Sequence, residues 1–180
     1  MNEVIYKPRT GTELSRACPG TPIFLYGDLC DYVKENGIGR TLTELFSISP
    51  RCFILLQNPD NPKSGHWLAL SIHPATREIF FFSSYGGKPD VEKNRWISHA
   101  DRIRSHQDED VLNDGLKDMA IRGWTVHYND HPYQFEGDKT ATCGIWSAAF
   151  LNSGMNPDDF FYYTNFHHLD ALDYYEALFM

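Results

Sequence analysis

Three stretches in the first half of the chain show the hydrophobic patterns of β-strands. Residues 51–58 (RCFILLQN) form a short, nearly continuous apolar run, which is typical of a strand covered on both faces. Residues 66–72 (HWLALSI) alternate between apolar and polar side chains, and residues 78–84 (EIFFFSS) form the third run. The loop PDNPKSG and the turn HPATR separate the three runs. This pattern predicts a three-strand meander at the centre of a sheet.

The segment before the meander has the spacing of helices. Residues 1–20 are polar and rich in Pro and Gly, which predicts an N-terminal arm or extended lead-in. From Leu25 to Val33 apolar side chains recur at helical spacing, which predicts a helix that stops at Gly37. A second short helix is expected in RTLTELF, with Thr41 as its N-cap and Glu44 closing a capping box.

The second half of the chain is mainly helical in pattern. Residues 90–122 are polar with sparse apolar anchors, which predicts two surface helices, the second closed by Gly123. GWTVHYN is a fourth strand, residues 143–154 form a helix, and two short helices follow from Asn156. The order of elements predicts an α+β fold, and a chain of 180 residues suits a single domain, residues 1–180.

Composition excludes several classes of function. The formal net charge is −8, so a generally basic nucleic-acid-binding surface is not expected. The four cysteines include no CxxC pair, which favours reduced thiols in a cytosol-like compartment over a zinc knuckle or a disulfide framework. The N-terminus has no apolar run after its charges, and no stretch has the length of a membrane-spanning helix. We therefore expect a protein that is not secreted and has no membrane partner.

Cys143 is the thiol in the most suitable setting for chemistry. It lies at the predicted start of a helix after a polar loop, where the positive end of the helix dipole lowers a thiol pKa. Gly144 keeps the space beside it open. The alternative is that Cys143 is a small hydrophobic residue of the core, as free cysteines often are. The other cysteines lack this setting and are interpreted as structural.

His66 is the candidate base among eight histidines. A polar loop delivers it to the first position of a strand, and Trp67 beside it either shields the ring from water or belongs to the core. A surface histidine without a catalytic role is the alternative interpretation of His66. The pair His167 and His168 has no third ligand at a metal-binding spacing, so a solvated face is expected there and no metal or cofactor is predicted.

The ordered set GHWLAL, SYGG, YQ and TCGIW resembles a known family of cysteine proteases. That family is typified by the adenovirus maturation protease and the SUMO-specific proteases. The capsid-maturation versions carried by virophages, large DNA viruses and Polinton-like elements are the most similar in character. The resemblance runs from about Pro22 to Phe150. It implies a papain-like or adenain-like fold, with a mixed central sheet of about four to five strands flanked by helices.

The resemblance also implies roles for individual residues. His66 is the general base and Cys143 the nucleophile, while Gln134 and the Cys143 backbone N–H form the oxyanion hole. The sequence departs from the family at Ser83, where an acidic or amide residue usually orients the histidine. A serine hydroxyl accepts a hydrogen bond from the ring without supplying charge, so Ser83 is interpreted as a weak orienter. Asp90 and Glu78 remain alternative sources of the charge.

The implied activity is that of a cysteine endopeptidase working through an acyl-enzyme thioester. The resemblance suggests cleavage after small residues such as glycine, in a narrow cleft for which Trp67 is a candidate roof and Gly144 a substrate contact. It implies capsid or scaffold precursors as substrates, in the host cytoplasm, a viral factory or the virion interior. A peptide activator stays open, and the net charge of −8 argues against activation by DNA.

Three other functions remain open at this point. The first is a protease that removes a ubiquitin-like modifier, and the second is an inactive member that binds a peptide, which the serine at position 83 keeps open. The third is an acyltransferase on the same fold, but no basic phosphate-binding cluster for an acyl-CoA is evident.

Overall fold

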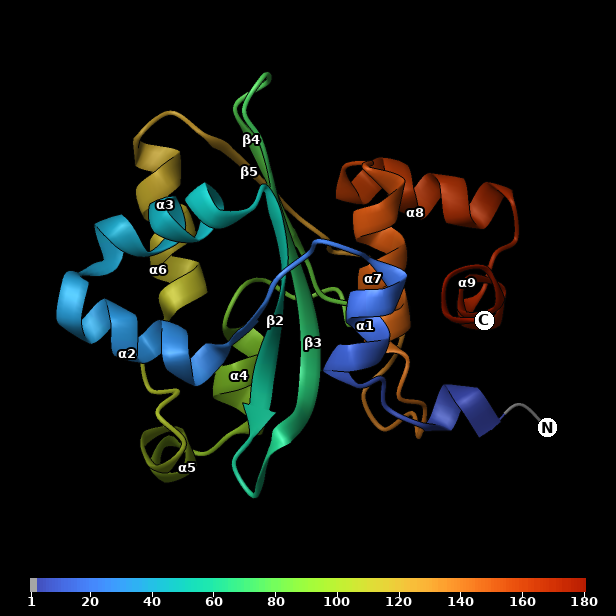
Figure 1. Ribbon diagram of the computed structural model, residues 1–180, viewed down its shortest axis with the longest axis horizontal. Helices are drawn as coiled ribbons and strands as arrows, with labels where there is room; N and C mark the ends of the chain where they lie inside the picture. Colours follow the sequence, from blue (N-terminus) through green and yellow to red (C-terminus); the bar gives the residue numbers. More distant parts are fainter. Residues whose placement is uncertain (1–2) are drawn as a thin grey trace.

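The computed structural model describes residues 3–180 and shows one mixed sheet with helices on both faces (Figure 1). The strands are β1 (Ile23–Leu25), β2 (Arg51–Asn58), β3 (Asn61–His73), β4 (Glu78–Phe82) and β5 (Thr125–Tyr128). They lie in the order β1-β2-β3-β4-β5. The central three are antiparallel, whereas β1 and β5 run parallel to their neighbours. The α+β class and the mixed sheet predicted from the sequence are confirmed.

The helices divide between the two faces of the sheet (Figure 1). One face carries α2 (Tyr26–Asn36), α3 (Ile38–Ile48), α4 (Val91–Trp96), α5 (His99–Arg104) and α6 (Val111–Ile121). The other carries α1 (Gly11–Ala17), α7 (Cys143–Ser153), α8 (Pro157–Phe166) and α9 (Ala171–Phe179), with the short 3-10 helix η1 (Glu3–Tyr6) at its margin. No helix among these residues is both long and apolar enough to cross a membrane.

Alternation along the strands builds two hydrophobic cores. In β2, Ile54 packs with the α2–α3–α6 side and Leu55 with the α7 side. In β3, Leu68 and Trp67 divide in the same way. Successive strand side chains point to opposite faces, so a strand covered on both faces is apolar throughout. This explains the continuous apolar run that marked β2 in the sequence.

Helix α7 is the central helix of the second core. All residues from Cys143 to Leu151 are buried, and the helix packs along β3. A helix that is hydrophobic all round belongs inside a protein. It ends at Gly154, which has a left-handed φ of 66° that costs glycine little. The rigid packing of α7 fixes the position of its first residue, Cys143.

Several local predictions differ from the structure. Helix α3 begins at Ile38, and Thr41 lies inside it, buried and donating its hydroxyl to the Gly37 carbonyl, so the predicted capping box is wrong. Strand β3 extends back to Asn61, which leaves only Pro59 and Asp60 as the turn. The polar segment of residues 90–122 holds α4, α5 and α6 where two helices were expected.

The N-terminal segment is also more ordered than predicted. Where an arm or extended lead-in was expected, α1 begins with a capping box between Thr10 and Glu13, and Leu14 is fully buried in the second core. Burial of one large aliphatic side chain contributes ~1.5–3 kcal/mol, and α1 also packs against α7 and α9. The first two residues of the predicted arm lie outside the described part.

Candidate active site

His66 lies near the point where β3 leaves its turn, opposite Leu56 of β2. The ladder shifts register at Gln57 and Asn58, and Gly65 approaches the Leu56 carbonyl so closely that a Cβ would lie 1.9 Å from its oxygen. Only glycine fits this approach. By strand alternation, His66 then shares a face with Leu68, the face that carries α4.

The imidazole of His66 contacts Ser83 and Glu92 through one ring nitrogen. Its Nε2 lies 3.0 Å from the Ser83 Oγ and 3.3 Å from the Glu92 Oε2. Ser83 in turn donates its hydroxyl to the Glu92 Oε1 at 2.6 Å. All three side chains are buried. The Ser83 hydroxyl therefore accepts a hydrogen bond from the ring and donates one to the Glu92 carboxylate. That carboxylate places a negative charge beside the ring.

Glu92 is a site residue that the sequence reasoning missed. It lies in the first turn of α4, nine positions beyond the serine at which the family usually has its acid. Neither of the carboxylates considered instead occupies this place: Asp90 bonds Tyr26, and Glu78 pairs with His127. Gly87 leaves room for the carboxylate, because a Cβ there would lie 2.9 Å from the Glu92 Oε1.

Cys143 occupies the first position of α7, and its Sγ accepts a hydrogen bond from the Trp67 N–H at 3.5 Å. Burial alone raises the pKa of this thiol, but the hydrogen bond and charge of His66, together with the backbone N–H groups of Trp67 and Gly144, lower it below its usual value. Burial lowers the pKa of His66, and its contacts with Cys143 and Glu92 reverse this and raise the pKa to about 9. Both shifts favour a thiolate–imidazolium pair.

The other three thiols have the opposite electrostatics. All four cysteines are free and buried. Burial raises the pKa of Cys18 to about 11 and that of Cys30 to about 12, and it raises the pKa of Cys52 further. Thiolates are the reactive form of cysteine. Near neutral pH the structure therefore singles out Cys143 by its charge environment and not by its exposure.

Gln134 is buried in the loop that leads to α7. Its Oε1 accepts a hydrogen bond from the Ser84 Oγ at 2.6 Å, and its Nε2 donates to the Thr140 carbonyl at 3.3 Å. Ser84 thus holds the amide group in place. The first N–H groups of a helix have no intrahelical partner, so the Cys143 N–H is a second donor at this end of α7.

Trp67 does not roof a cleft, contrary to the prediction. Its ring is buried in the second core, where the indole N–H donates to the Arg9 carbonyl at 2.9 Å. The reason is strand alternation, which turns Trp67 to the face opposite His66. Gly144 packs tightly here, because a Cβ would lie 2.9 Å from the Arg9 Cβ and 3.2 Å from the Trp67 Cδ1. Its role in the structure is close packing.

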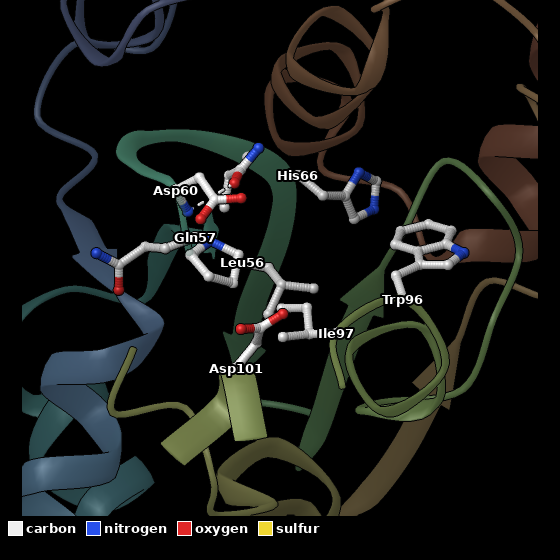
Figure 2. A pocket seen from close by; sticks show the side chains of 10 residues that line it. Leu56, Gln57, Asp60, His66, Trp96, Ile97 and Asp101 are labelled. Atoms are coloured by element: carbon white, nitrogen blue, oxygen red, sulfur yellow. Dashed lines mark hydrogen bonds between the residues drawn. The ribbon is translucent and has the colours of Figure 1, made fainter. Parts of the chain in front are cut away.

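Two other aromatic rings flank His66. The ring centroid of Tyr85 lies 5.1 Å from that of His66, and the centroid of Trp96 lies 5.5 Å away in an edge-on arrangement. Figure 2 shows the Trp96 indole, which extends from the end of α4, beside the imidazole. Aromatic surroundings exclude water and strengthen the charge interactions of the ring.

A pocket of about 330 Å³ opens beside His66 (Figure 2). Its walls come from the β2–β3 turn, the end of α4 and the start of α5, and they include Leu56, Ile97, Asp60 and Asp101. Cys143 does not line it.

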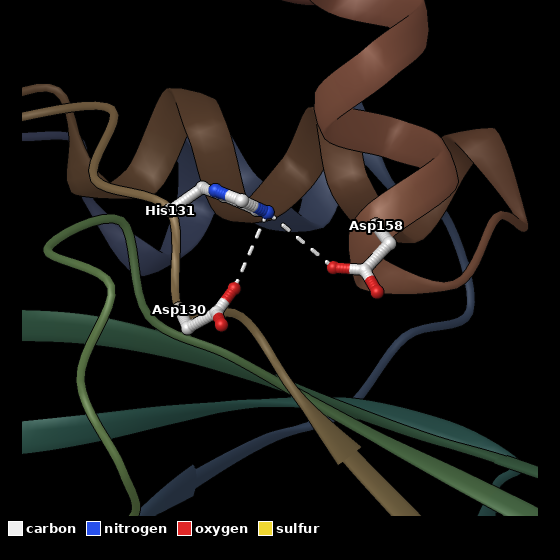
Figure 3. A group of neighbouring side chains, drawn as sticks. All are labelled: Asp130, His131 and Asp158. Atoms are coloured by element: carbon white, nitrogen blue, oxygen red, sulfur yellow. Dashed lines mark ion pairs between the residues drawn. The ribbon is translucent and has the colours of Figure 1, made fainter.

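A separate cluster of Asp130, His131 and Asp158 has the donor types of a metal site (Figure 3). The His131 Nε2 lies 3.3 Å from Asp130 and 3.5 Å from Asp158, and both carboxylates are largely exposed. The imidazole also stacks on Phe161 at 3.8 Å between ring centroids. Exposed acidic groups often cluster in this way without an ion, so we assign no metal to this cluster.

Comparisons with known proteins find a similarity among solved structures. No protein-family model matches this chain, and no curated protein matches it. Among solved structures, it is similar to the SUMO protease Ulp1 with the catalytic cysteine oxidized to a sulfinic acid, with a TM-score of 0.35 and 16% sequence identity. The match covers 76% of this chain and 57% of the other, so the chain spans little more than half of that protein. The functional proposal therefore rests on the geometry around Cys143 and His66.

Proposed function

We propose that this protein is a thiol peptidase in which Cys143 attacks a peptide carbonyl and His66 transfers the protons. One observation carries the proposal: His66 contacts a hydroxyl and a carboxylate through Nε2, and the same imidazole lowers the pKa of the Cys143 thiol. A nucleophile, a base and a group that orients the base are the parts that covalent catalysis by cysteine needs.

The proton inventory follows from the contacts of the imidazole. Nε2 bonds Ser83 and Glu92, which leaves Nδ1 to take the proton of the Cys143 thiol. The thiolate adds to the carbonyl carbon and forms a C–S bond. The C–N bond then breaks, the amine leaves with the proton from Nδ1, and a thioester remains on Cys143. Water, deprotonated by His66, hydrolyses the thioester and releases the carboxylate product.

The oxyanion is stabilised at the N-terminal end of α7 in this proposal. The Cys143 N–H and the Gln134 amide lie on the loop and helix start that also carry the thiol. Gln134 is held by Ser84, and its Nε2 turns from the Thr140 carbonyl to the oxyanion when a substrate is bound. Removing one such donor costs roughly 10²–10³ in kcat in other enzymes.

Glu92 supplies the charge and Ser83 the connection. The carboxylate stabilises the imidazolium directly across 3.3 Å, and the Ser83 hydroxyl fixes the ring orientation through bonds to both partners. A charge-assisted hydrogen bond is roughly twice as strong as a neutral one. The serine at position 83 therefore does not indicate an inactive protein, because Glu92 of α4 supplies the negative charge.

The substrate class follows from the sequence resemblance and not from the geometry. We propose capsid or scaffold precursor proteins cleaved after a small residue such as glycine, within an infected host cell or the virion. A ubiquitin-like modifier joined to a protein is the alternative, since the sequence resemblance also includes the SUMO-specific proteases. Both substrates are cleaved by the same thioester chemistry.

The test is the capture of the acyl-enzyme. Peptide esters ending in glycine are mixed with the protein and with Cys143→Ser, and intact mass spectrometry follows the adduct. The proposal predicts a thioester on Cys143 that decays in water and a loss of turnover in the variant. Turnover that survives Cys143→Ser would contradict it. Parallel incubation with a capsid precursor and a SUMO-linked protein separates the two substrate classes.

A further inference from the structure

A bridge joins the end of α4 to the loop before α7, next to the proposed catalytic residues. The Glu136 Oε1 accepts a hydrogen bond from the Trp96 indole N–H at 2.6 Å and lies 3.3 Å from the Arg95 Nη2. These three side chains are partly exposed, so solvent competes for them. The bridge links two segments that are 40 positions apart in the chain.

The bridge holds in place the ring that covers His66. Trp96 packs edge-on against His66 and against Tyr85, with centroid distances of 5.5 Å and 4.9 Å. Its indole is 39% exposed, so it is the outer layer over the imidazole. His66 and Cys143 are each only 8% exposed. The Cys143 sulfur therefore offers little of its surface to a peptide carbonyl.

The loop before α7 is held by hydrogen bonds at its base, which is formed by Gln134 and Ala141, and by few contacts at its tip, residues 135–139. Gln134 is bound to Ser84 at one end, and the Ala141 N–H donates to the Ile5 carbonyl at the other. Residues 135–139 are exposed, and among the described residues their polar contacts with α4 all run through Glu136. Gly137 has a φ of 82° with open space around it, so the tip turns without steric resistance.

We propose that the contact of Glu136 with Trp96 and Arg95 is a gate that must open before a peptide reaches Cys143. Opening frees the Trp96 ring to leave His66, while Gln134 and the start of α7 keep their places because the loop base is bound separately. The gate rests on the proposed function, since it controls access to the proposed nucleophile. It is an autoinhibitory contact that substrate binding has to break.

The size of the effect follows from the kind of contact. Because solvent competes for this partly exposed bridge, its contacts contribute less than a buried charge-assisted hydrogen bond does. A partly exposed bridge of this kind shifts an opening equilibrium about five- to tenfold, since ~1.4 kcal/mol corresponds to tenfold. Its removal should raise the rate of any reaction that requires the open state by the same factor.

The experiment compares two electrophiles on Cys143, iodoacetamide and a glycyl vinyl sulfone peptide, in the unaltered protein and in three variants. Glu136→Ala removes the acceptor, and Trp96→Phe removes the indole N–H but keeps a ring over His66. Glu44→Ala is the matched control, because it breaks an exposed glutamate–arginine pair on the remote helix α3. We expect the peptide probe to label Glu136→Ala and Trp96→Phe about five- to tenfold faster, with a smaller change for iodoacetamide and none in the control.

Salt provides a second measurement on the unaltered protein. At 1 M ionic strength the Debye length is about 3 Å, so the pairing of Glu136 with Arg95 weakens and peptide labelling should accelerate, whereas Glu136→Ala should not respond. Equal peptide labelling rates in all proteins would overturn the gate while leaving the thiol peptidase proposal standing. A Cys143 that reacts with neither probe in any protein would overturn both.

Discussion

Replacing Glu92 with glutamine removes the charge beside His66 and keeps the shape of the side chain. The carboxylate lies 3.3 Å from the His66 Nε2 and accepts the Ser83 hydroxyl at 2.6 Å. An amide at the same place still accepts a hydrogen bond from the serine hydroxyl but carries no charge. The variant therefore isolates the electrostatic contribution of Glu92 from its packing.

The expected magnitude comes from the pKa of His66. Burial lowers this pKa, and the contacts with Cys143 and Glu92 raise it to about 9. An opposite charge at this distance shifts a pKa by about 1–3 units, and each unit corresponds to ~1.4 kcal/mol. Without the carboxylate, the pKa of His66 should fall by about 1–3 units, and the Cys143 thiolate should be less stable by the corresponding free energy.

The assay is the pH dependence of kcat/KM with a peptide ester. In the unaltered protein the rate rises as Cys143 ionises at its lowered pKa, and falls as His66 deprotonates at about 9. Glu92→Gln should move the alkaline limb of the profile to lower pH and reduce kcat/KM at pH 8 about twofold for a one-unit shift and about tenfold for a two-unit shift. An alkaline limb that stays in place in this variant would refute the assignment of the charge to Glu92.

Three further substitutions test other contacts. Ser83→Asp should not raise kcat/KM, because a second carboxylate beside Glu92 forces one of the pair to bind a proton. Adding Glu92→Gln to this variant should restore activity. A gain in kcat/KM from Ser83→Asp alone would contradict the assignment of the charge to Glu92. Lys93→Met should lower the free energy of unfolding in urea by about 2–4 kcal/mol, because Lys93 is buried and bonds Asp110 and two backbone carbonyls. Gly144→Ala should cost about 1–3 kcal/mol in the same measurement through overpacking, and unchanged stability would show that the Arg9 side chain yields.

The pairing of His66 with Ser83 was accessible through the family resemblance, which implied the role of Ser83, and not through strand periodicity. Ser83 directly follows β4, the antiparallel neighbour of β3, and its Oγ lies 3.0 Å from the His66 Nε2. The start of α7 was equally clear, since a polar loop runs directly into a fully apolar helix. The structure brings Cys143 to the same place.

The source of the negative charge was not accessible in this way. Glu92 reaches the ring from a six-residue helix within a polar segment, and no periodicity distinguishes it from neighbouring charged residues. Its position depends on Asp90, which bonds Tyr26, and on Lys93, which is buried beside Asp110. Such long-range polar contacts leave no local pattern in a single sequence.

Two other differences had local signals that composition obscured. The spacing of Thr10 and Glu13 is that of a capping box, and it marks α1 within a segment whose Pro and Gly content suggested an arm. The alternation that places His66 on one face also places Trp67 on the other. The aromatic cover of His66 comes instead from Tyr85 and Trp96, which follow later in the chain.

The central claim is that Cys143 is the activated thiol of this protein, and its alkylation rate tests this most directly. The protein is treated with limiting iodoacetamide at neutral pH, and peptide mapping follows each of the four free cysteines. We predict that Cys143 reacts well ahead of Cys18 and Cys30, whose pKa values burial raises to about 11 and about 12. His66→Ala should remove that advantage. A Cys143 that reacts no faster than Cys18 in the native protein would contradict the claim.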